Sequence, residues 1–457
     1  MTTIQHARLW LNQEDWSDRT IHALTINGGR SNPFAAADVA TVGVTINFWG
    51  RPLPIIGDRV DIAGWLPGQT TYMPLFSGNV TDVAYEPAAG VNGEAVVSLT
   101  AADMMRALDG LPLGEEPWTN QYWSDRMDAI WELARDGLRD PSWMAGPTTR
   151  PNSILYAYYP HGQTGPPEAP FMLAVLRDRD IDSQPALALL REYMTQIGHA
   201  LYMIPGPRSP LTDQPPWPGA GVGYTNLFNL DPAPAGRIPA SVIVAADPTP
   251  RYWVNLSTTA HKVVVRAFRR PDLEYVGAEF YAQGGFPARF GYKVRSISTD
   301  MVDEDTPPEG FTTPQELANF WLWRVQWPAY MVDLTLSLHP GHPDAAAVWD
   351  AVTVNGPAQC GVRVDVEGVT GTTEAARSGD YEWVIEATEY ELTADGWDVR
   401  LTLAPATVYA GTLPIPPTAA DTYQDVLAWH PTYTELLGAH PTYTDLLETR
   451  HPHPAGV

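Results

Sequence analysis

Apolar and polar residues alternate along most of the first 110 positions, which is the period of half-buried β-strands. The stretch Thr41–Phe48 places valine, valine, isoleucine and phenylalanine at every second position. Residues 58–64 and 94–100 repeat this alternation, and glycine and proline residues separate the segments. The pattern therefore predicts a β-rich N-terminal part, which a short helix over Ala101–Leu108 follows.

The spacing of apolar residues changes to that of helices between about residue 118 and residue 200. One stripe at helical spacing consists of Met127, Ile130, Trp131, Ala134 and Leu138. A second helix is predicted from Gln184 to Ile197, directly before a glycine. Residues 205–250 are rich in proline and predict a long ordered loop or linker.

Strand patterns return after about residue 253. The run Val263–Phe268 is a strong strand candidate. A helix is predicted to begin at Thr313, because Pro314 suits the first helical position and Glu316 completes a capping box. Residues 381–403 read as a β-hairpin.

These changes of pattern predict a mainly β chain with an α+β insertion. We expect a β-rich part over 1–112 and an α+β part over 113–252 that includes the proline-rich stretch. A second β-rich part is expected over 253–410, and a C-terminal extension over 411–457.

The extension contains three consecutive units: TYQDVLAWHP, TYTELLGAHP and TYTDLLETRHP. In each unit a threonine with an acid three residues later favours a helix start, and the proline ends the helix. Helices this short are marginal in water, so we expect the units to lie against a partner. Within each unit a tyrosine and a leucine share one face: Tyr423 and Leu427, Tyr433 and Leu437, Tyr443 and Leu447. An unstructured tail with duplicated units is the alternative.

Composition and charge narrow the class of protein. A chain of 457 residues with 44% hydrophobic residues can build several cores. The formal net charge of −25 argues against contacts with the phosphates of nucleic acids and against docking on anionic lipid. With Cys360 as the only cysteine, an internal disulfide is impossible. Seventeen tryptophans indicate large aromatic contact surfaces, either in cores or at interfaces.

Three stretches are informative when they are taken in order. The first is Gly29-Arg30-Ser31 followed by ATVGVTINFWGRPLPIIGDRVDI and PLFSGNVTDV; the second is SQPALALLREYMTQIGHALYMI; the third is DAVTVNG followed by VIEATEYELTADGWDVRLTLAP. Together they resemble the minor tail or tail-tip hub proteins of long-tailed phages of actinobacteria, and more distantly the baseplate hubs of contractile tails. The sequence departs from that family at residues 47–52, NFWGRP, and leaves the partner of this loop open.

The resemblance implies two tail-tube-like β-barrels with the α+β domain inserted between them, assembled as a ring that is usually a homotrimer. It implies that the chain is made in the host cytoplasm and located at the tail tip of the virion. The implied partners are other copies of the chain, the distal tail protein, the tape measure protein, and fibre or spike proteins. DNA would be passing cargo, and no stable membrane binding is implied.

Candidate metal ligands add little to this picture. Residues 178–183 resemble a calcium loop but lack its glycine and its bidentate acid, so an acidic helix start is the better interpretation. The acids of residues 300–305 are interpreted as a solvated loop. His430, His440, His451 and His453 have no fixed acid or cysteine beside them in the sequence. We therefore predict neither a metal nor a cofactor.

The sequence contains no GxSxG, HExxH or P-loop motif, so we predict a protein that is not an enzyme. Two rival functions stay open. A glycan-binding adhesin would use aromatic side chains such as Trp118, Tyr122, Trp123, Tyr156, Tyr158 and Tyr159. A cell-wall hydrolase would need a pair of carboxylates or a metal site, and the spacing of the residues identifies neither.

Overall fold

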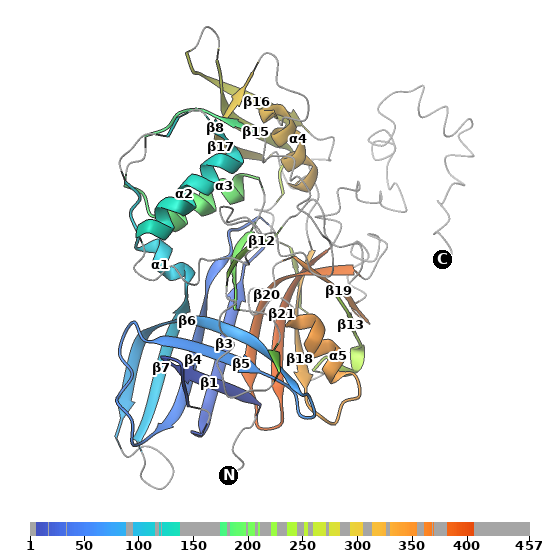
Figure 1. The fold of residues 1–457 in the computed structure, drawn as a ribbon. Helices are drawn as coiled ribbons and strands as arrows, with labels where there is room; N and C mark the ends of the chain where they lie inside the picture. The colour runs from blue at the N-terminus through green and yellow to red at the C-terminus, as the bar shows by residue number, and fades with distance from the viewer. Residues whose placement is uncertain are drawn as a thin grey trace, which may run out of the picture.

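The computed structural model of the chain consists of a β lobe and an α+β lobe (Figure 1). It describes residues 6–16, 18–32, 34–87, 95–114, 118–119, 121–137, 174–180, 183–197, 200–205, 209–210, 221–225, 235–244, 251–254, 259–270, 274–283, 293–304, 313–325, 330–353, 361–367, 369 and 382–405. The predicted mainly β character of the chain is confirmed over these residues.

The β lobe is built on one sheet whose strands come from both ends of the chain. From one edge to the other these strands are β14 (Arg251–Val254), β18 (Tyr330–Leu338), β21 (Trp397–Pro405), β20 (Glu382–Leu392), β3 (Ile21–Gly29), β4 (Asp38–Phe48), β7 (Ala95–Asp103), β6 (Thr71–Glu86), β5 (Arg59–Gly64), β1 (Ala7–Leu11) and β2 (Glu14–Asp15). Off this path lie β11 (Ser209–Pro210), β13 (Arg237–Ile238) and β19 (Val362–Val366), with the helices η3 (Ala240–Val242) and α5 (Ala345–Val352) beside the sheet. Among the described strands the path from β14 to β2 is open.

The N-terminal and C-terminal β-rich parts meet where β3 pairs with β20. Gly29 has a φ of +113°, and a Cβ placed on it would lie 2.3 Å from the carbonyl oxygen of Glu386. Only glycine therefore allows the two strands to approach this closely. One hydrophobic core contains side chains of both parts, such as Ile26 and Val44 from the first and Leu334 and Leu401 from the second. The two parts are joined through both backbone and core.

Over its described residues, the α+β lobe contains a five-stranded sheet and four helices. The sheet has the order β16 (Val276–Gln283), β15 (Lys262–Arg269), β17 (Val294–Asp303), β9 (Val175–Leu176) and β8 (Gln121–Tyr122). The helices are α1 (Met105–Asp109), α2 (Trp123–Gly137), α3 (Ala186–Gln196) and α4 (Pro314–Val325). A two-stranded sheet of β10 (Ala200–Ile204) and β12 (Gly221–Thr225) lies between the two lobes in Figure 1.

Several predicted elements are confirmed. Helix α3 matches the predicted helix from Gln184 to Ile197, and the hairpin of β20 and β21 matches residues 381–403. The capping box of α4 is formed as predicted: the Thr313 N–H donates to Glu316 Oε2 at 2.7 Å, and the Glu316 N–H donates to Thr313 Oγ1 at 3.2 Å. Local signals of this kind act within one turn of the chain, so they can be predicted from the sequence.

Two expectations are wrong. The helix predicted over Ala101–Leu108 begins only at Met105, because β7 continues to Asp103 and pairs with β4. The proline-rich stretch 205–250 is not simply a loop, since its described residues include β11, β12, β13 and η3. These short strands pair with β6, β10 and β19, and such distant partners cannot be read from local sequence.

The C-terminal extension lies outside the described residues, so the predicted helical units stay a prediction. The division at residues 112, 252 and 410 also stays a prediction. Within the described ranges, no helix is both long enough and apolar enough to cross a membrane.

Candidate functional sites: a charged cleft and an apolar loop

The six residues predicted to bind a partner, from Tyr423 to Leu447, lie outside the described residues. The candidate sites on the described surface are therefore new to the structure. Two surfaces, one on each lobe, differ in chemistry, and a buried ion pair of the β lobe lies near Arg324 of the α+β lobe.

The first site is organised around Asp300 of β17, whose carboxylate is buried. It accepts hydrogen bonds from Arg177 Nε at 3.1 Å, Arg179 Nη1 at 3.0 Å and the Tyr193 hydroxyl at 2.9 Å. The fully buried Arg126 lies 3.7 Å from the same carboxylate. The interpretation of Asp300 as part of a solvated loop is therefore wrong, since surrounding guanidinium groups compensate its buried charge.

Tyr193, on α3, keeps its proton beside this carboxylate. Burial raises the pKa of Tyr193 to about 12, and the neighbouring Asp300 charge acts in the same direction. The hydroxyl therefore donates a hydrogen bond to Asp300 at any physiological pH. The sequence around Asp300 could not predict this cluster, because the residues that surround Asp300 come from three other segments of the chain.

A cleft with a volume of about 540 Å³ opens beside this cluster on the five-stranded sheet. Its lining is Arg177, Arg179, Glu192, Arg266, Ala267, Phe268, Gly277, Ala278, Glu279, Ser298, Thr299 and Asp300. The guanidinium of Arg177 lies 4.0 Å above the ring of Phe268. On the exposed sheet surface, Arg266 Nε donates to Glu279 Oε1 at 3.2 Å. The cleft thus combines guanidinium and carboxylate groups with an aromatic wall.

The second site is the loop between β4 and β5, where the sequence departs from the family it resembles. Four large apolar side chains are exposed there: Trp49 at 42%, Leu53 at 44%, Ile55 at 65% and Ile56 at 71%. The guanidinium of Arg19 lies 3.9 Å from the centre of the Trp49 ring. Exposed apolar residues that gather in one loop, with tryptophan and arginine among them, are typical of protein–protein interfaces.

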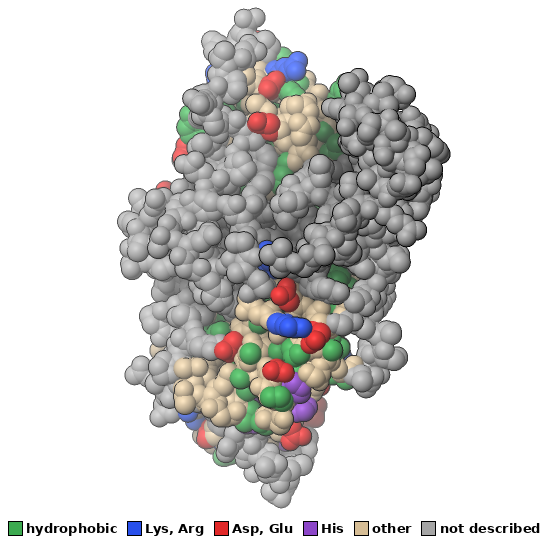
Figure 2. Space-filling view, turned by 90° about the vertical axis from the view of Figure 1, so that its right-hand side faces the viewer, with side chains coloured by type: hydrophobic (Ala, Val, Ile, Leu, Met, Phe, Trp, Pro, Cys, Tyr) green, Lys and Arg blue, Asp and Glu red, His purple; other side chains and the backbone are tan. Residues whose placement is uncertain are grey.

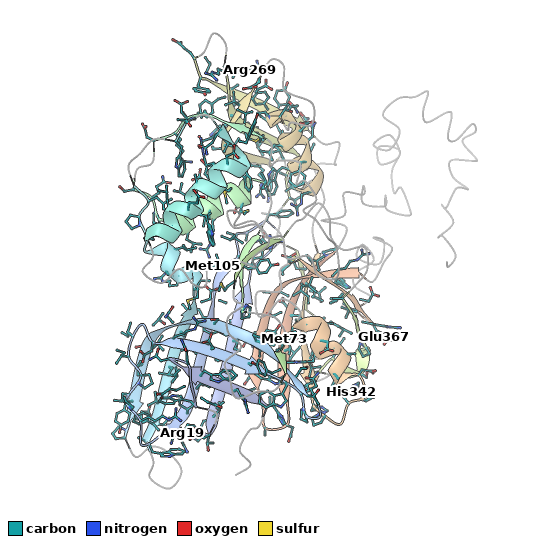
Figure 3. All side chains as sticks on the ribbon, in the orientation of Figure 1. Arg19, Met73, Met105, Arg269, His342 and Glu367 are labelled. Atoms are coloured by element: carbon teal, nitrogen blue, oxygen red, sulfur yellow. The ribbon has the colours of Figure 1, made fainter. Side chains whose placement is uncertain are left out.

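The two sites lie far apart. In Figure 3, Arg19 marks the apolar loop at the bottom of the β lobe, and Arg269, the last residue of β15, lies at the top of the α+β lobe. Figure 2 shows the side of the molecule that carries α5, where acidic, basic and apolar side chains are mixed over its visible described part. That part offers no comparable apolar or one-signed patch.

A buried ion pair joins the two halves of the β lobe, where the glycine-arginine turn that follows β3 meets β20. Arg30 and Glu386 are 1% and 0% exposed, and Arg30 Nε lies 2.5 Å from Glu386 Oε2. Burial, and secondly the charge of Arg30, lowers the pKa of the nearby Arg324 on α4 to about 9. Burial also raises the pKa of Glu386. The arginine of the Gly29-Arg30-Ser31 motif therefore connects the turn after β3 to β20.

The aromatic residues that a glycan-binding adhesin would use differ in their exposure. Trp118 and Trp123 are buried at 7% and 1% exposure and belong to the core of the α+β lobe, while Tyr122 is 39% exposed. Tyr156, Tyr158 and Tyr159 lie outside the described residues. Within the part of the chain that the structure describes, no group of three or more histidine, cysteine, aspartate or glutamate side chains is arranged to hold a metal ion.

Comparison with known proteins gives matches in structure alone. No protein-family model and no curated protein matches the sequence. The fold is similar to that of the tail protein from Neisseria meningitidis MC58, with a TM-score of 0.52 and 12% identity over 88% of this chain and 97% of that one. A 43 kDa tail protein of prophage MuSo2 from Shewanella oneidensis gives a TM-score of 0.49 and 12% identity, over 88% and 99% of the two chains.

A third similar structure is a component of the type VI secretion system of E. coli, itself described as similar to the T4 bacteriophage tail proteins gp27 and gp5. Its TM-score is 0.44 and its identity 8%, over 89% of this chain and 79% of that one. Of these three structures, the Neisseria protein has a TM-score above 0.5, so the shared fold is argued from that protein. This chain therefore has the fold of a tail protein along most of its length.

Proposed function

We propose that this protein is a structural component of a phage-type tail, a hub at the tail tip that joins the tail tube to distal fibre or spike proteins. The observation that carries the proposal is the fold shared with a tail protein over nearly the full length of both chains. The three quoted sequence stretches, which resemble tail-tip hubs of actinobacterial phages, point to the same class independently. The role is mechanical and requires no catalytic group.

The hub is a homotrimeric ring in this proposal. The halves of the β lobe on either side of the β3–β20 pairing correspond to the two tail-tube-like barrels, so three copies supply six halves. The backbone pairing of β3 with β20 and the buried pair of Arg30 and Glu386 support a fixed angle between the two halves of the β lobe. A net charge of −25 suits a ring around a path for DNA, because like charges repel. DNA is then passing cargo.

Each end of the hub meets a different neighbour. The apolar loop that contains Trp49 and Ile55 is the surface for the tube side, where the distal tail protein and the tape measure protein end. The repeats of the C-terminal extension tether a ring subunit or an adjacent tail protein through the face of Tyr433 and Leu437 and its equivalents. Burial of each large side chain contributes roughly 2–3 kcal/mol, and each docked unit raises the effective concentration of the next.

Localisation tests the proposal directly. Antibody against this chain, detected with gold on intact virions, is expected at the tail tip, and an antibody against the major tube protein serves as the control along the tail. Label distributed along the whole tail, or absent from particles that carry the control label, contradicts a hub.

Assembly gives a second test. Light scattering of the purified protein, alone and mixed with neighbouring tail proteins, is expected to show a species of three times the 50.2 kDa chain mass. A chain that stays monomeric in both preparations argues against a ring.

A further inference from the structure

The five-stranded sheet of the α+β lobe has one covered face and one exposed face. Val263, Val265 and Ala267 of β15 point toward the core that α3 and α4 complete, and all three are buried. The two residues between them face the other way: Val264 is buried at 8% exposure, whereas the Arg266 side chain is 61% exposed. The cleft lies on this face, and the side chains of Arg177 and Arg266, at 35% and 61% exposure, are accessible to another protein segment.

Two of the arginines in the cleft have spare hydrogen-bond donors. Arg177 uses its Nε for Asp300, and Arg266 uses its Nε for Glu279. A guanidinium has five N–H donors in a planar fork that matches a carboxylate. Among the described residues, the terminal nitrogens of both groups have no hydrogen bond or ion pair. A carboxylate that enters the cleft can therefore bind them without displacing an internal partner.

The cleft is less acidic than the chain as a whole. Its lining carries three guanidinium groups and three carboxylates, so its formal charges cancel: Arg177, Arg179 and Arg266 against Glu192, Glu279 and Asp300. The buried Arg126 lies 3.7 Å from the Asp300 carboxylate. In a chain whose formal charge is −25, an acidic segment is therefore repelled less here than over most of the surface.

The floor of the cleft leaves room for an apolar group beside the carboxylate. A Cβ placed on Gly277 would meet no atom within 4 Å, and the Phe268 ring stands near it in the wall. A volume of about 540 Å³ is that of a typical binding pocket. The cleft therefore suits a short segment with an acid and an aromatic residue close together.

The C-terminal extension of this chain has that composition. Residues 406–457 contain five acids and a single arginine, and each unit places an acid two residues after its tyrosine: Asp425, Glu435 and Asp445. Strand β21 ends at Pro405, 17 residues before Thr422, which is a reach of up to about 56 Å. We propose that the cleft of one copy binds a TY…HP unit of a neighbouring copy in an extended conformation, with the acid on Arg177 and Arg266 and the tyrosine over Gly277. In an extended segment the tyrosine, the acid two residues later and the leucine four residues later lie on one face, whereas in a helix the acid would face away from the tyrosine. This assignment rests on the tether proposed above.

Photo-cross-linking in the full-length protein tests the assignment. A benzoylphenylalanine in place of Tyr433 is irradiated, and the products are separated by size and mapped by mass spectrometry. Products of twice the chain mass, linked to peptides that contain residues 266–268, 277–279 or 298, are expected. Arg266→Glu reverses a charge in the cleft, and Gly277→Leu adds a side chain at a position where a Cβ meets no atom within 4 Å. Each is expected to reduce the yield about tenfold.

Arg400→Glu is the matched control, because Arg400 is 62% exposed and lies 3.6 Å from Glu389 across two strands of the other lobe. It is expected to leave the cross-link unchanged. An equal loss in the control, cross-links within a single chain, or cross-links outside the cleft overturn this inference. Cross-links to a different tail protein also overturn this inference, but they are consistent with the proposal that the repeats act as a tether. If no cross-link forms and deletion of the repeats leaves the tails complete, the tether itself is refuted.

Discussion

Removal of the Arg30 charge should destabilise the protein far more than removal of an exposed arginine. In Arg30→Met the carboxylate of Glu386, which is fully buried, loses the partner that lies 2.5 Å away. Breaking a buried pair from one side typically costs about 3–5 kcal/mol. Arg324 remains near Glu386, so the lower end, about 3 kcal/mol, is expected. Arg400→Met breaks an exposed pair, which contributes about 0–1 kcal/mol.

The assay is urea unfolding followed by tryptophan fluorescence. With a slope of roughly 3 kcal/mol per molar urea, Arg30→Met should lower the midpoint by about 1 M, and Arg400→Met by less than about 0.3 M. The deficit of Arg30→Met should also depend on pH. Burial raises the pKa of Glu386 in the folded state, and loss of Arg30 raises it further.

The sign follows from proton linkage. A carboxyl group whose folded-state pKa is raised favours the folded state fully below its unfolded pKa, and this contribution is lost as the pH rises through the folded value. The difference between Arg30→Met and wild type should therefore shrink as the pH falls from 8 toward 5. Equal midpoint shifts for the two variants, or a deficit that grows on acidification, would refute the reasoning.

Four further predictions use other parts of the molecule. Gly29→Ala should cost about 3 kcal/mol in urea unfolding because its Cβ overlaps the opposite strand, whereas Gly43→Ala, whose Cβ meets open space, should change stability by less than about 1 kcal/mol. Ile55→Ser should leave the unfolding midpoint nearly unchanged but reduce incorporation into particles, measured by immunoblot of purified virions. Burial raises the pKa of Asp103 to about 7 against the hydrogen bonds that it accepts from backbone N–H groups, so wild type should lose stability relative to Asp103→Asn between pH 4 and pH 8. Deletion of 418–457 should leave the unfolding transition intact and release a neighbouring component from the particle, and replacement of one tyrosine–leucine pair should release less.

Sequence reasoning was most successful where a signal is local. The alternation over Thr41–Phe48 sets which side of β4 is buried, since successive side chains of a strand point to opposite faces. The capping box at Thr313 sets the start of α4 within a single turn. It was less successful at Ala101, where a helix-forming composition lies in a strand because β4 supplies a partner along its edge.

The candidate sites depended on contacts between distant segments. Asp300 was interpreted as solvated because its neighbours in sequence are acids and prolines, yet its neighbours in space are arginines that the chain brings from residues 126, 177 and 179. The sequence shows that the loop after β4 contains several apolar residues, but it does not show that their side chains are exposed. Apolar residues in a sequence are more often buried than exposed, so only the packing identifies this loop as a surface.

By itself the sequence determined the β-rich character of the chain, the capped start of α4, the acidic charge and the three terminal units, because each depends on residues close together in the chain. The tertiary structure decided that β3 pairs with β20, and that Arg30 meets Glu386 across 356 positions. It also decided that Gly277 and Arg266 open onto a cleft. Pairings at such separations depend on which strand edges and buried charges find each other when the whole chain closes, and no local period encodes that choice.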